Sequence, residues 1–342
     1  MDAMGGHKAR VRQPTLRDVA RELNISVTTV SKVINDHDDI SEETRIKVWN
    51  TIHRIGYTPN FMAANLRRKH GSIVGLMVSD ISQPYFTEVI KGYETTLNNG
   101  GYQTMIFTSF EDPERELALL RQTASLNLAG IIIDIAQNSQ NTIEFLRTLD
   151  IPFVLSNRYV DKDKDYYVVA DNIEVGYQAV RHLLSKKPMA PVICINGPDS
   201  ISPTLDRYEG YLKAINEAGI EFREELVFNN HYGLQDGYSV GIEICQTFQE
   251  PISVFCSTDV IALGVIRAAL EMGRSIPGDI AVIGVDDIEF SSYSKPTLTT
   301  MALPKGQIGS KSADKLIQLI ENKVIEVPRE YVQPELKIRE TT

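Results

Sequence analysis

From residue 72 onward, short apolar runs alternate with amphipathic stretches, and this alternation limits the fold more than any other feature of the chain. The apolar runs cover residues 72–80, 103–109, 130–135, 152–157, 166–172, 191–197, 225–230, 252–258 and 279–287. The amphipathic stretches cover residues 85–99, 113–127, 173–186, 204–218, 236–248, 260–272 and 306–322. Near-continuous Val and Ile between helices indicates parallel strands that are buried on both faces. Nine strands and seven helices are too many for one compact doubly wound α/β layer, so the pattern predicts two Rossmann-like lobes.

Polar side chains follow many of these predicted strands. They are Asp80, Ser109, Asn157-Arg158, Asp171-Asn172, Asn196, Asp259 and Asp286-Asp287. Because the carboxyl ends of parallel strands line the crevice in which ligands bind, we expect a ligand site between the lobes. A single Asp or Asn can also cap the helix that follows it, and Asp259 before VIALGVIRAAL fits such a cap.

The stretch Leu16–Asn35, LRDVARELNISVTTVSKVIN, predicts two short helices with a tight turn between them. Thr15 fits the N-cap of the first helix, and Asn24-Ile25-Ser26 can end that helix and cap the next. A helix-turn-helix places its base-reading side chains at the start of its second helix. Here those positions hold Val27, Thr28, Thr29, Ser31 and Lys32. An ordinary helical hairpin with a solvated polar face fits the same stretch.

A third helix is predicted from Ser41 to Ile55, with Ser41 as its N-cap and Gly56 as the residue that ends it. Its apolar stripe includes Trp49, the single tryptophan of the chain. A three-helix head is small, so we expect Trp49 to fill its core.

Charge is distributed unevenly along the chain. Residues 1–70 hold 12 Lys+Arg and 8 Asp+Glu, a net of +4, whereas the other 272 residues carry a net of −14. This asymmetry suits a chain that presents only its head to a polyanion. The head is followed by a segment that Pro59 opens and Arg67-Arg68-Lys69 ends. So short a segment is marginal as an isolated helix, which predicts a linker that becomes helical against DNA phosphates.

The sequence disfavours several classes of protein. No apolar run approaches the ~20 residues that span a bilayer. Residues 1–13, which we expect to be a disordered leader, lack the apolar region of a secretory signal. The three cysteines form no CxxC pair and have no metal-ligand spacing, so they fit a reducing cytoplasm and predict neither a metal nor a cofactor.

Residues 237–241 match the GxSxG nucleophile elbow, but we expect an ordinary helix there. The elbow needs a strand that leads directly into the serine, whereas Ser239 follows a loop and Asp236 is expected to cap its helix. An α/β-hydrolase also needs a histidine after the serine, and the last histidine is His231. Without a P-loop, a GxGxxG or an HExxH, the sequence predicts that the chain is not an enzyme.

The order of these parts resembles the LacI/GalR family of bacterial transcriptional repressors. The matching stretches are LRDVARELNISVTTVSKVIN, ISEETRIKVWNTIHRIGYTPN, SDISQPYFTEVIKGYE, DNIEVGYQAVRHLL, DRYEGY, FCSTDVIALG, IPGDIAVIGVDD and PTLTTM. The resemblance runs from Thr15 to about Arg339. It implies an α-helical helix-turn-helix head plus hinge helix, joined to an α/β periplasmic-binding-protein-like core of two Rossmann-like lobes.

The resemblance also divides the chain. It implies a leader (1–13), a DNA-binding domain (14–57), a hinge helix or linker (58–70) and an effector-binding and dimerisation core (71–342). Within the core, the first lobe would hold about 71–171 plus 302–330. The second lobe would hold about 172–301 plus 331–342.

By the same resemblance, Val27 and Thr28 would meet base edges in the major groove, and Lys32 would reach further, toward guanine. Leu66 matches the hinge leucine that wedges into the minor groove and kinks the duplex. The neighbouring Ala64-Asn65 departs from the basic-small pair that is frequent there. The other residues implied to bind DNA are Thr15, Thr29, Ser31 and Asn35, as phosphate contacts, and Asn60.

The family's effector pocket maps onto Tyr85, Phe86, Asn157, Arg158, Asp171, Ile201, Arg207, Tyr232 and Asp286. Aromatic faces combined with Asn, Arg and Asp suit a polyhydroxylated ligand. Ile201 departs from members that carry a polar group there, and Tyr85-Phe86 also fits core packing at a helix start. Two arginines could hold an anion, so the implied effector is a sugar, a sugar phosphate or a sugar acid.

Together these features predict a cytoplasmic bacterial regulator, nucleoid-associated when bound, that represses carbohydrate-use genes. It would bind double-stranded pseudo-palindromic operator DNA as a homodimer, with no membrane partner. A small effector would change the angle between the lobes and thereby the affinity for DNA. PELKIRETT at the C-terminus has no leucine heptads, which favours a dimer over a tetramer. The alternatives are a cytosolic sugar-binding protein without a regulatory role and a regulator controlled by a protein corepressor.

Overall fold

A computed structural model describes residues 14–34, 39–58, 71–136, 140–187 and 190–342. The chain forms two compact units, Met1–Lys69 and His70–Thr342. The leader (1–13) and nearly all of the hinge segment lie outside the described residues, as do the predicted DNA contacts Asn35, Asn60 and Leu66.

The first unit contains the three predicted helices. They are α1 (Leu16–Leu23), α2 (Val27–Ile34) and α3 (Glu42–Ile55). Asn24 adopts a left-handed φ of 52° and ends α1. The Ser26 hydroxyl accepts a hydrogen bond from the backbone N–H of Thr29 at 3.0 Å, and Ser41 accepts one from Thr44 at 3.4 Å. The predicted caps of α2 and α3 are therefore confirmed.

The core of this unit consists of small aliphatic side chains, and the prediction for Trp49 was wrong. The buried residues are Val19, Ala20, Val30, Val33, Val48 and Ile52. Trp49 is 38% exposed and lies against His53, with the ring centroids 6.1 Å apart. Val48 and Ile52 are four residues apart and share the inner face of α3, so Trp49, about 100° further around the helix, points outward.

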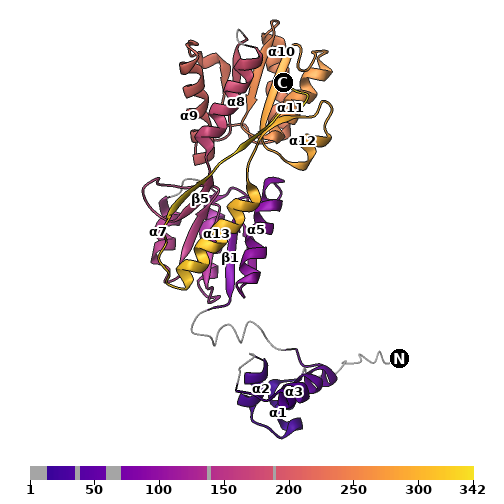
Figure 1. Cartoon of the computed structure of the whole chain (residues 1–342), viewed down its shortest axis with the longest axis vertical. Helices are drawn as coiled ribbons and strands as arrows, with labels where there is room; N and C mark the ends of the chain where they lie inside the picture. Colours follow the sequence, from indigo (N-terminus) through magenta and orange to yellow (C-terminus); the bar gives the residue numbers. More distant parts are fainter. Residues whose placement is uncertain (1–13, 35–38, 59–70, 137–139, 188–189) are drawn as a thin grey trace, which may run out of the picture. The chain divides into compact units, whose positions relative to one another are not determined.

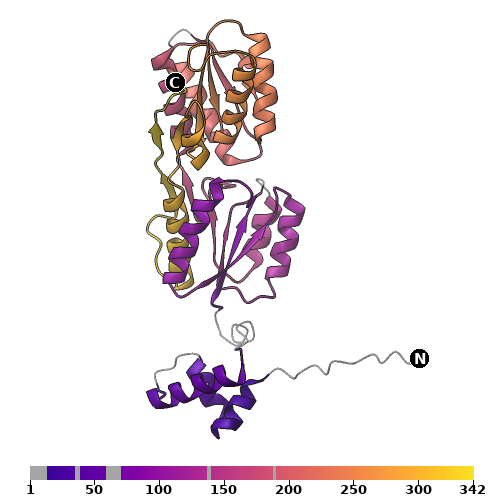
Figure 2. The same cartoon turned by 90° about the vertical axis from the view of Figure 1, so that its right-hand side faces the viewer.

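The second unit is built from two six-stranded sheets, each with helices on both faces (Figures 1 and 2). The first sheet has the order β11-β5-β4-β3-β1-β2, and its strands pair in parallel. Its strands are β1 (Ile73–Val78), β2 (Gln103–Thr108), β3 (Gly130–Ile133), β4 (Phe153–Ser156), β5 (Tyr167–Ala170) and β11 (Arg329–Val332). Its helices are α5 (Tyr85–Asn99), α6 (Pro113–Thr123), α7 (Gln140–Thr148) and α13 (Lys305–Ile320). We call this sheet and its helices the first lobe.

The second lobe repeats this plan with the order β12-β10-β9-β8-β6-β7, in which β12 pairs antiparallel with β10. Its strands are β6 (Val192–Ile195), β7 (Val227–Phe228), β8 (Ile252–Cys256), β9 (Ile280–Asp286), β10 (Thr299–Ala302) and β12 (Glu335–Lys337). Its helices are α8 (Asn172–Lys186), α9 (Ser202–Glu217), α10 (Leu234–Thr247), α11 (Asp259–Glu271), the short α12 (Glu289–Tyr293) and a 3-10 turn, η1 (Glu224–Leu226).

Side-chain alternation along the strands separates the cores on the two faces of a sheet. On β1, Val74, Leu76 and Val78 pack with α5 and α13, whereas Ile73 and Met77 pack with α6 and α7. In the second lobe α8 and α9 cover one face and α10 and α11 the other. The prediction of strands buried on both faces is therefore confirmed for inner strands such as β1, β3, β8 and β9, whereas the edge strand β2 is half-buried to exposed along its length.

The chain passes between the lobes three times. The passages lie between β5 and α8, between β10 and α13, and between β11 and β12. The sequence analysis did not predict β10, which is short and buried, β11 and β12, which are short and partly exposed, or the helices α7 and α12. The run 225–230 gives only the two-residue strand β7 after η1.

Two predicted caps were wrong. Thr258, not Asp259, caps α11, because its hydroxyl accepts the Ile261 N–H at 3.2 Å and Asp259 is the first helical residue. Asp236 lies inside α10 and accepts the backbone N–H groups of Tyr232 and Gly233 from there, at 2.9 and 3.2 Å. Among the described residues no helix is long and apolar enough to cross a membrane.

Candidate functional site

The first candidate site is the outer face of α2. Val27 is 42% exposed, Thr28 is exposed and Thr29 is half-buried, while Val30 and Val33 face the core. Thr15 is held at the start of α1, where its N–H and its hydroxyl both donate to Asp18, at 2.9 and 2.6 Å. An apolar and a hydroxyl side chain thus stand free at the start of α2, where they can contact a thymine methyl group or a base edge.

Lys32 does not stand free in this unit. Its ammonium forms an ion pair with Asp39, and 40% of the Lys32 side chain is exposed. The partner lies in the connection between α2 and α3, so the chain supplies a carboxylate to the side chain that is predicted to read guanine. A DNA contact by Lys32 therefore competes with an internal ion pair.

The second candidate site is a cavity of about 70 Å³ between the two lobes. This volume holds a few water molecules at ~10–15 Å³ each. The predicted pocket residues that line it are Tyr85, Phe86, Asn157, Arg158, Ile201, Arg207, Tyr232 and Asp286. Asp171 does not line it. That carboxylate caps α8 through the Glu174 N–H at 3.1 Å and accepts from Gln333 at 3.1 Å.

The cavity is also lined by residues that the sequence analysis did not name as pocket residues. They are Gln83, Gly197, Pro198, Pro203, Thr204, His231, Ser257 and Thr258. Gly197-Pro198 follow β6 closely and Ser257-Thr258 follow β8 directly, so the strand-end rule could have found these four.

On the first-lobe side, Arg158 is buried and donates several hydrogen bonds. Its guanidinium donates to both carboxylate oxygens of Glu111, at 2.8 and 2.9 Å, and to the carbonyls of Ile135 and Ala136, both at 2.8 Å. Its Nε lies 3.5 Å from the buried Asp134 carboxylate. Asn157 donates to that same carboxylate at 3.0 Å.

On the second-lobe side, Arg207 is fixed by neutral acceptors. It donates to the side-chain oxygen of Asn172 at 2.9 Å and to the Ser257 carbonyl at 2.5 Å. Helix packing sets this geometry, because a Cβ at Gly176 would lie 2.0 Å from the Arg207 carbonyl oxygen. Only glycine lets α8 approach α9 so closely. Burial lowers the pKa of Arg207, and the neighbouring Asp286 opposes this shift.

Asp286 reaches the cavity from a strained position. Its φ is 116°, a region that L-residues rarely adopt. Lys305 of α13 donates to the backbone carbonyls of Asp286 and Asp287, both at 2.7 Å. Burial raises the pKa of Asp286 to about 6.

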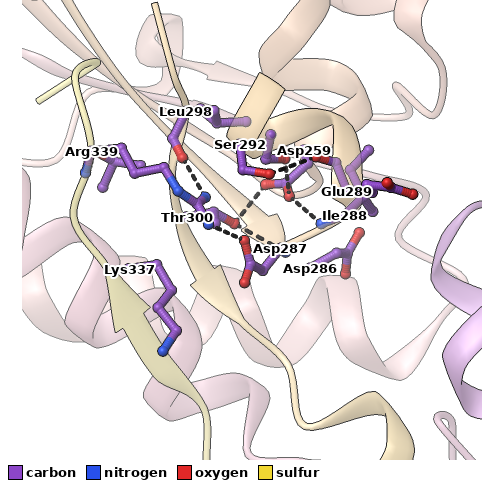
Figure 3. A network of polar contacts seen from close by, with 12 residues as sticks. Asp259, Asp286, Asp287, Ile288, Glu289, Ser292, Leu298, Thr300, Lys337 and Arg339 are labelled. Atoms are coloured by element: carbon purple, nitrogen blue, oxygen red, sulfur yellow. Dashed lines mark hydrogen bonds and ion pairs between the residues drawn. The ribbon is translucent and has the colours of Figure 1, made fainter. Parts of the chain in front are cut away.

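Asp259 fixes the loop that follows Asp286 (Figure 3). Its carboxylate accepts the Ile288 N–H at 3.0 Å and the hydroxyls of Ser291 and Thr300 at 2.7 and 2.6 Å. Arg339 pairs with Asp287 at 2.6 Å on the other side (Figure 3). Burial raises the pKa of Asp259 to about 7. The buried network and Lys305 together hold the strained backbone in place.

Two cavity-lining hydroxyls are buried and form no hydrogen bond with any described residue. They are Tyr85 Oη and Ser257 Oγ. A buried hydroxyl without a partner is costly, so both are groups that a polar ligand can satisfy. The Tyr85 and Phe86 rings meet edge to face, with centroids 5.3 Å apart. Both side chains are buried and also pack in the first-lobe core.

The lobes also bond to each other beside the cavity. The Tyr232 hydroxyl donates to Glu111 at 2.8 Å. The Tyr159 hydroxyl donates to Asp206 at 2.6 and 2.7 Å, and the Tyr159 N–H donates to Ser202 Oγ at 3.0 Å. Such contacts favour one angle between the lobes and can be lost at another.

The GxSxG match is a helix-packing pattern. Gly237 and Gly241 lie in α10, where a Cβ would come within 2.2 Å of the Ile261 carbonyl oxygen and 2.7 Å of the Ala268 Cβ. Ser239 donates to the Gln235 carbonyl as an ordinary helical serine. Within the described residues no three His, Cys, Asp or Glu gather as metal ligands.

Comparison with known proteins gives the same two-part division. The family model "Bacterial regulatory proteins, lacI family" matches residues 15–60, and "Periplasmic binding proteins and sugar binding domain of LacI family" matches residues 72–338. The NTD biosynthesis operon regulator NtdR of Bacillus subtilis is 31% identical over 96% of the chain and all of its own length. The repressor PurR of Photorhabdus laumondii is 32% identical over 94% of the chain and 95% of its own. The solved complex of the transcriptional regulator CelR with cellobiose has a TM-score of 0.75 at 26% identity, covering 96% of this chain and all of that one.

Proposed function

The chain belongs to the lacI family of bacterial regulatory proteins, and we propose that it represses carbohydrate-use genes under the control of a small sugar-like effector. It is a DNA-binding transcription regulator and not an enzyme, as the sequence predicted. The proposal adds a pseudo-palindromic operator, a homodimer in the cytoplasm that is nucleoid-associated when bound, and an effector that binds between the lobes.

The outer face of α2 supports the DNA-reading part of the proposal. Val27 and Thr28 are exposed at the start of α2 and would contact base edges. Lys32 would exchange Asp39 for a guanine. The phosphate contacts would come from Thr15, Thr29, Ser31 and Asn35, with Asn60 and the wedging Leu66 in the hinge segment.

One observation carries the effector part of the proposal: a cavity between the lobes is lined by charged side chains and by hydroxyls that have no hydrogen-bond partner among the described residues. The predicted pocket residues apart from Asp171 converge there from both lobes. Ligand binding at this place changes the balance between lobe angles only if the ligand contacts differ between them. The bonds from Tyr232 and Tyr159 across the cavity supply that difference, because they exist only when the lobes are close.

An exposed apolar surface on the second lobe supports the homodimer. Phe290 and Tyr293 of α12 are 62% and 77% exposed, and Leu234 nearby is 45% exposed. Large exposed apolar patches of this kind mark protein–protein contacts. A two-fold dimer would place two heads on the two half-sites of a palindrome.

Operator binding tests the proposal directly. We would measure binding of the full chain to the DNA upstream of its own gene by gel shift, with Lys32→Ala and Leu66→Ala as variants. The proposal expects salt-sensitive, sequence-specific binding that both variants weaken. Thermal unfolding against a panel of sugars would identify effectors, and their effect should vanish in Arg207→Ala. Absence of specific binding, or variants that bind like the parent, would contradict the proposal.

A further inference from the structure

The guanidinium of Arg158 already holds a carboxylate. Glu111 binds it with both oxygens, at 2.8 and 2.9 Å, in the paired geometry by which an arginine recognises an acid. Nη1, which donates to one of these oxygens, also donates to two backbone carbonyls at 2.8 Å. The place that a carboxylate or phosphate of a ligand would take on Arg158 is therefore filled by the protein itself.

The remaining charges around the cavity do not favour an anion either. Arg158 also faces the buried Asp134, and Arg207 faces Asp286. Two guanidinium groups are thus set against three carboxylates, those of Glu111, Asp134 and Asp286.

Two further basic side chains lie at or near the cavity, and each has an acidic neighbour. His231 lines it and interacts electrostatically with Asp236. Lys305 is not part of the cavity wall, but its ammonium donates to the Asp286 carbonyl and forms an ion pair with Glu88 at 2.9 Å. An additional buried anion would find no uncompensated positive charge.

Among the described residues, the cavity-lining atoms without a hydrogen-bond partner are two neutral hydroxyls and the Nε of Arg158, and that Nε already lies 3.5 Å from the Asp134 carboxylate. Tyr85 Oη and Ser257 Oγ are buried hydroxyls that can donate and accept, which matches the hydroxyl groups of a sugar. Phe86, Ile201 and Pro203 add apolar lining, which suits the C–H face of a sugar ring.

We propose that the cavity selects an uncharged polyhydroxylated ligand, and that Glu111 is the residue that excludes sugar acids and sugar phosphates. Glu111 acts through Arg158 and Tyr232, both of which line the cavity and both of which bind its carboxylate. An anionic ligand on Arg158 would have to displace Glu111 and leave that carboxylate near Asp134. The inference rests on the proposed function, because it assumes that the effector binds in this cavity.

The test compares ligands that differ only in charge. Neutral hexoses, pentoses and cellobiose would each be set against the corresponding uronic or aldonic acid and sugar phosphate. Affinity for the full chain would be measured by calorimetry, alongside its operator binding. We expect the preferred neutral sugar to bind at least about tenfold more tightly than its charged counterparts.

Glu111→Gln keeps the shape of the side chain and removes its charge. We expect this variant to reduce the preference for the neutral ligand by at least about tenfold. Glu114→Gln, three residues along the chain and exposed, should leave the preference unchanged. If Glu111→Gln does not fold, the preference of the parent chain alone decides the ligand class.

The outcomes separate this inference from the proposed function. A parent chain that prefers a sugar acid or phosphate, and still binds its operator, overturns only the exclusion of anions. A preference that Glu111→Gln leaves intact overturns the role of Glu111. Failure of every sugar, neutral or charged, to bind overturns the sugar effector and this inference together.

Discussion

Tyr232 of the second lobe donates a hydrogen bond of 2.8 Å to Glu111 of the first lobe, on the same oxygen that Arg158 binds. A single carboxylate thus connects the arginine of one cavity wall to the tyrosine of the other. The bond ties the angle between the lobes to the charge arrangement around the cavity. In the proposed two-state mechanism, this bond is a contact that would differ between the two lobe angles.

We expect Tyr232→Phe to weaken this contact without changing the size of the side chain. Loss of one hydrogen bond to a half-buried, charged acceptor should lower the free energy of unfolding by about 1–2 kcal/mol. Chemical denaturation measures the change. Tyr238→Phe is a matched control, because its hydroxyl bonds Glu271 at 2.6 Å on the surface, and its effect should be below about 0.5 kcal/mol. If both variants lowered the free energy of unfolding equally, the contact between the lobes would contribute no more than a surface hydrogen bond does.

We expect Gly176→Ala to displace α9 and with it Arg207. A Cβ at residue 176 would lie 2.0 Å from the Arg207 carbonyl oxygen. This oxygen belongs to the backbone, so it cannot move aside as the end of a flexible side chain can. Overpacking of this kind should cost about 1–3 kcal/mol in the free energy of unfolding and weaken effector binding. Gly306→Ala is the control, since nothing lies within 4 Å of its added methyl group. A Gly176→Ala chain with parental stability and effector affinity would refute the packing role.

The buried Glu116 should make stability depend on pH. Burial raises its pKa to about 7 from an ordinary 4.5, so between these values the folded chain holds a proton that the unfolded chain has lost. The contribution of Glu116 to the free energy of unfolding therefore falls as pH rises from about 4.5 to 7 and stays low above. Glu116→Gln should stabilise the chain by about 2–3 kcal/mol at pH 8 and by little at pH 4.5.

Denaturation of parent and variant across this pH range measures the effect of Glu116. Asp259 and Asp286 act in the same direction, because burial raises their pKa values to about 7 and about 6, so only the difference from the parent is informative. Glu114→Gln, exposed on the same helix, should leave the pH profile unchanged. A difference between Glu116→Gln and parent that is constant with pH would mean that Glu116 does not titrate there.

Lys32→Ala should reduce specific operator affinity by about tenfold or more, because a base contact is lost as well as a charge. Lys47→Ala removes the same charge from α3, where Lys47 pairs with Glu43 at 2.6 Å, and should change affinity little. Asp39→Asn should tighten binding, since it frees Lys32 from its internal partner. Anisotropy titrations on specific and random duplexes give these numbers. If Lys32→Ala reduced the affinity for the specific and the random duplex equally, Lys32 would not read a base.

Most of the fold could be predicted because its strands and helices leave apolar patterns in short stretches of sequence. The strands from β1 to β9 are continuous apolar runs, and β7 alone is much shorter than its run. β11 and β12 escaped prediction because they are short and carry exposed positions such as Glu335. β10 is almost fully buried, but its four residues, TTMA, do not lie in a run of Val and Ile. Trp49 misled the prediction because its size suggested a core role that Val48 and Ile52 already fill.

The cavity was predictable only in part, for a different reason. Resemblance and strand ends named Arg207 and Asp286, but Glu111 was missed because it stands in a loop before the α6 cap Asp112 and resembles any solvated acid. Its partners Arg158 and Tyr232 lie 47 and 121 residues further along the chain. Only the three-dimensional fold brings these three side chains together.

The most direct test of the account measures operator affinity with and without an effector. Fluorescence anisotropy would follow the full chain on a labelled duplex from upstream of its own gene, with a sugar that raises the melting temperature. We predict that the sugar changes the dissociation constant for the operator by at least about fivefold, and that Arg207→Ala abolishes the change. A sugar that stabilises the chain through this cavity yet leaves the operator affinity the same would contradict the account.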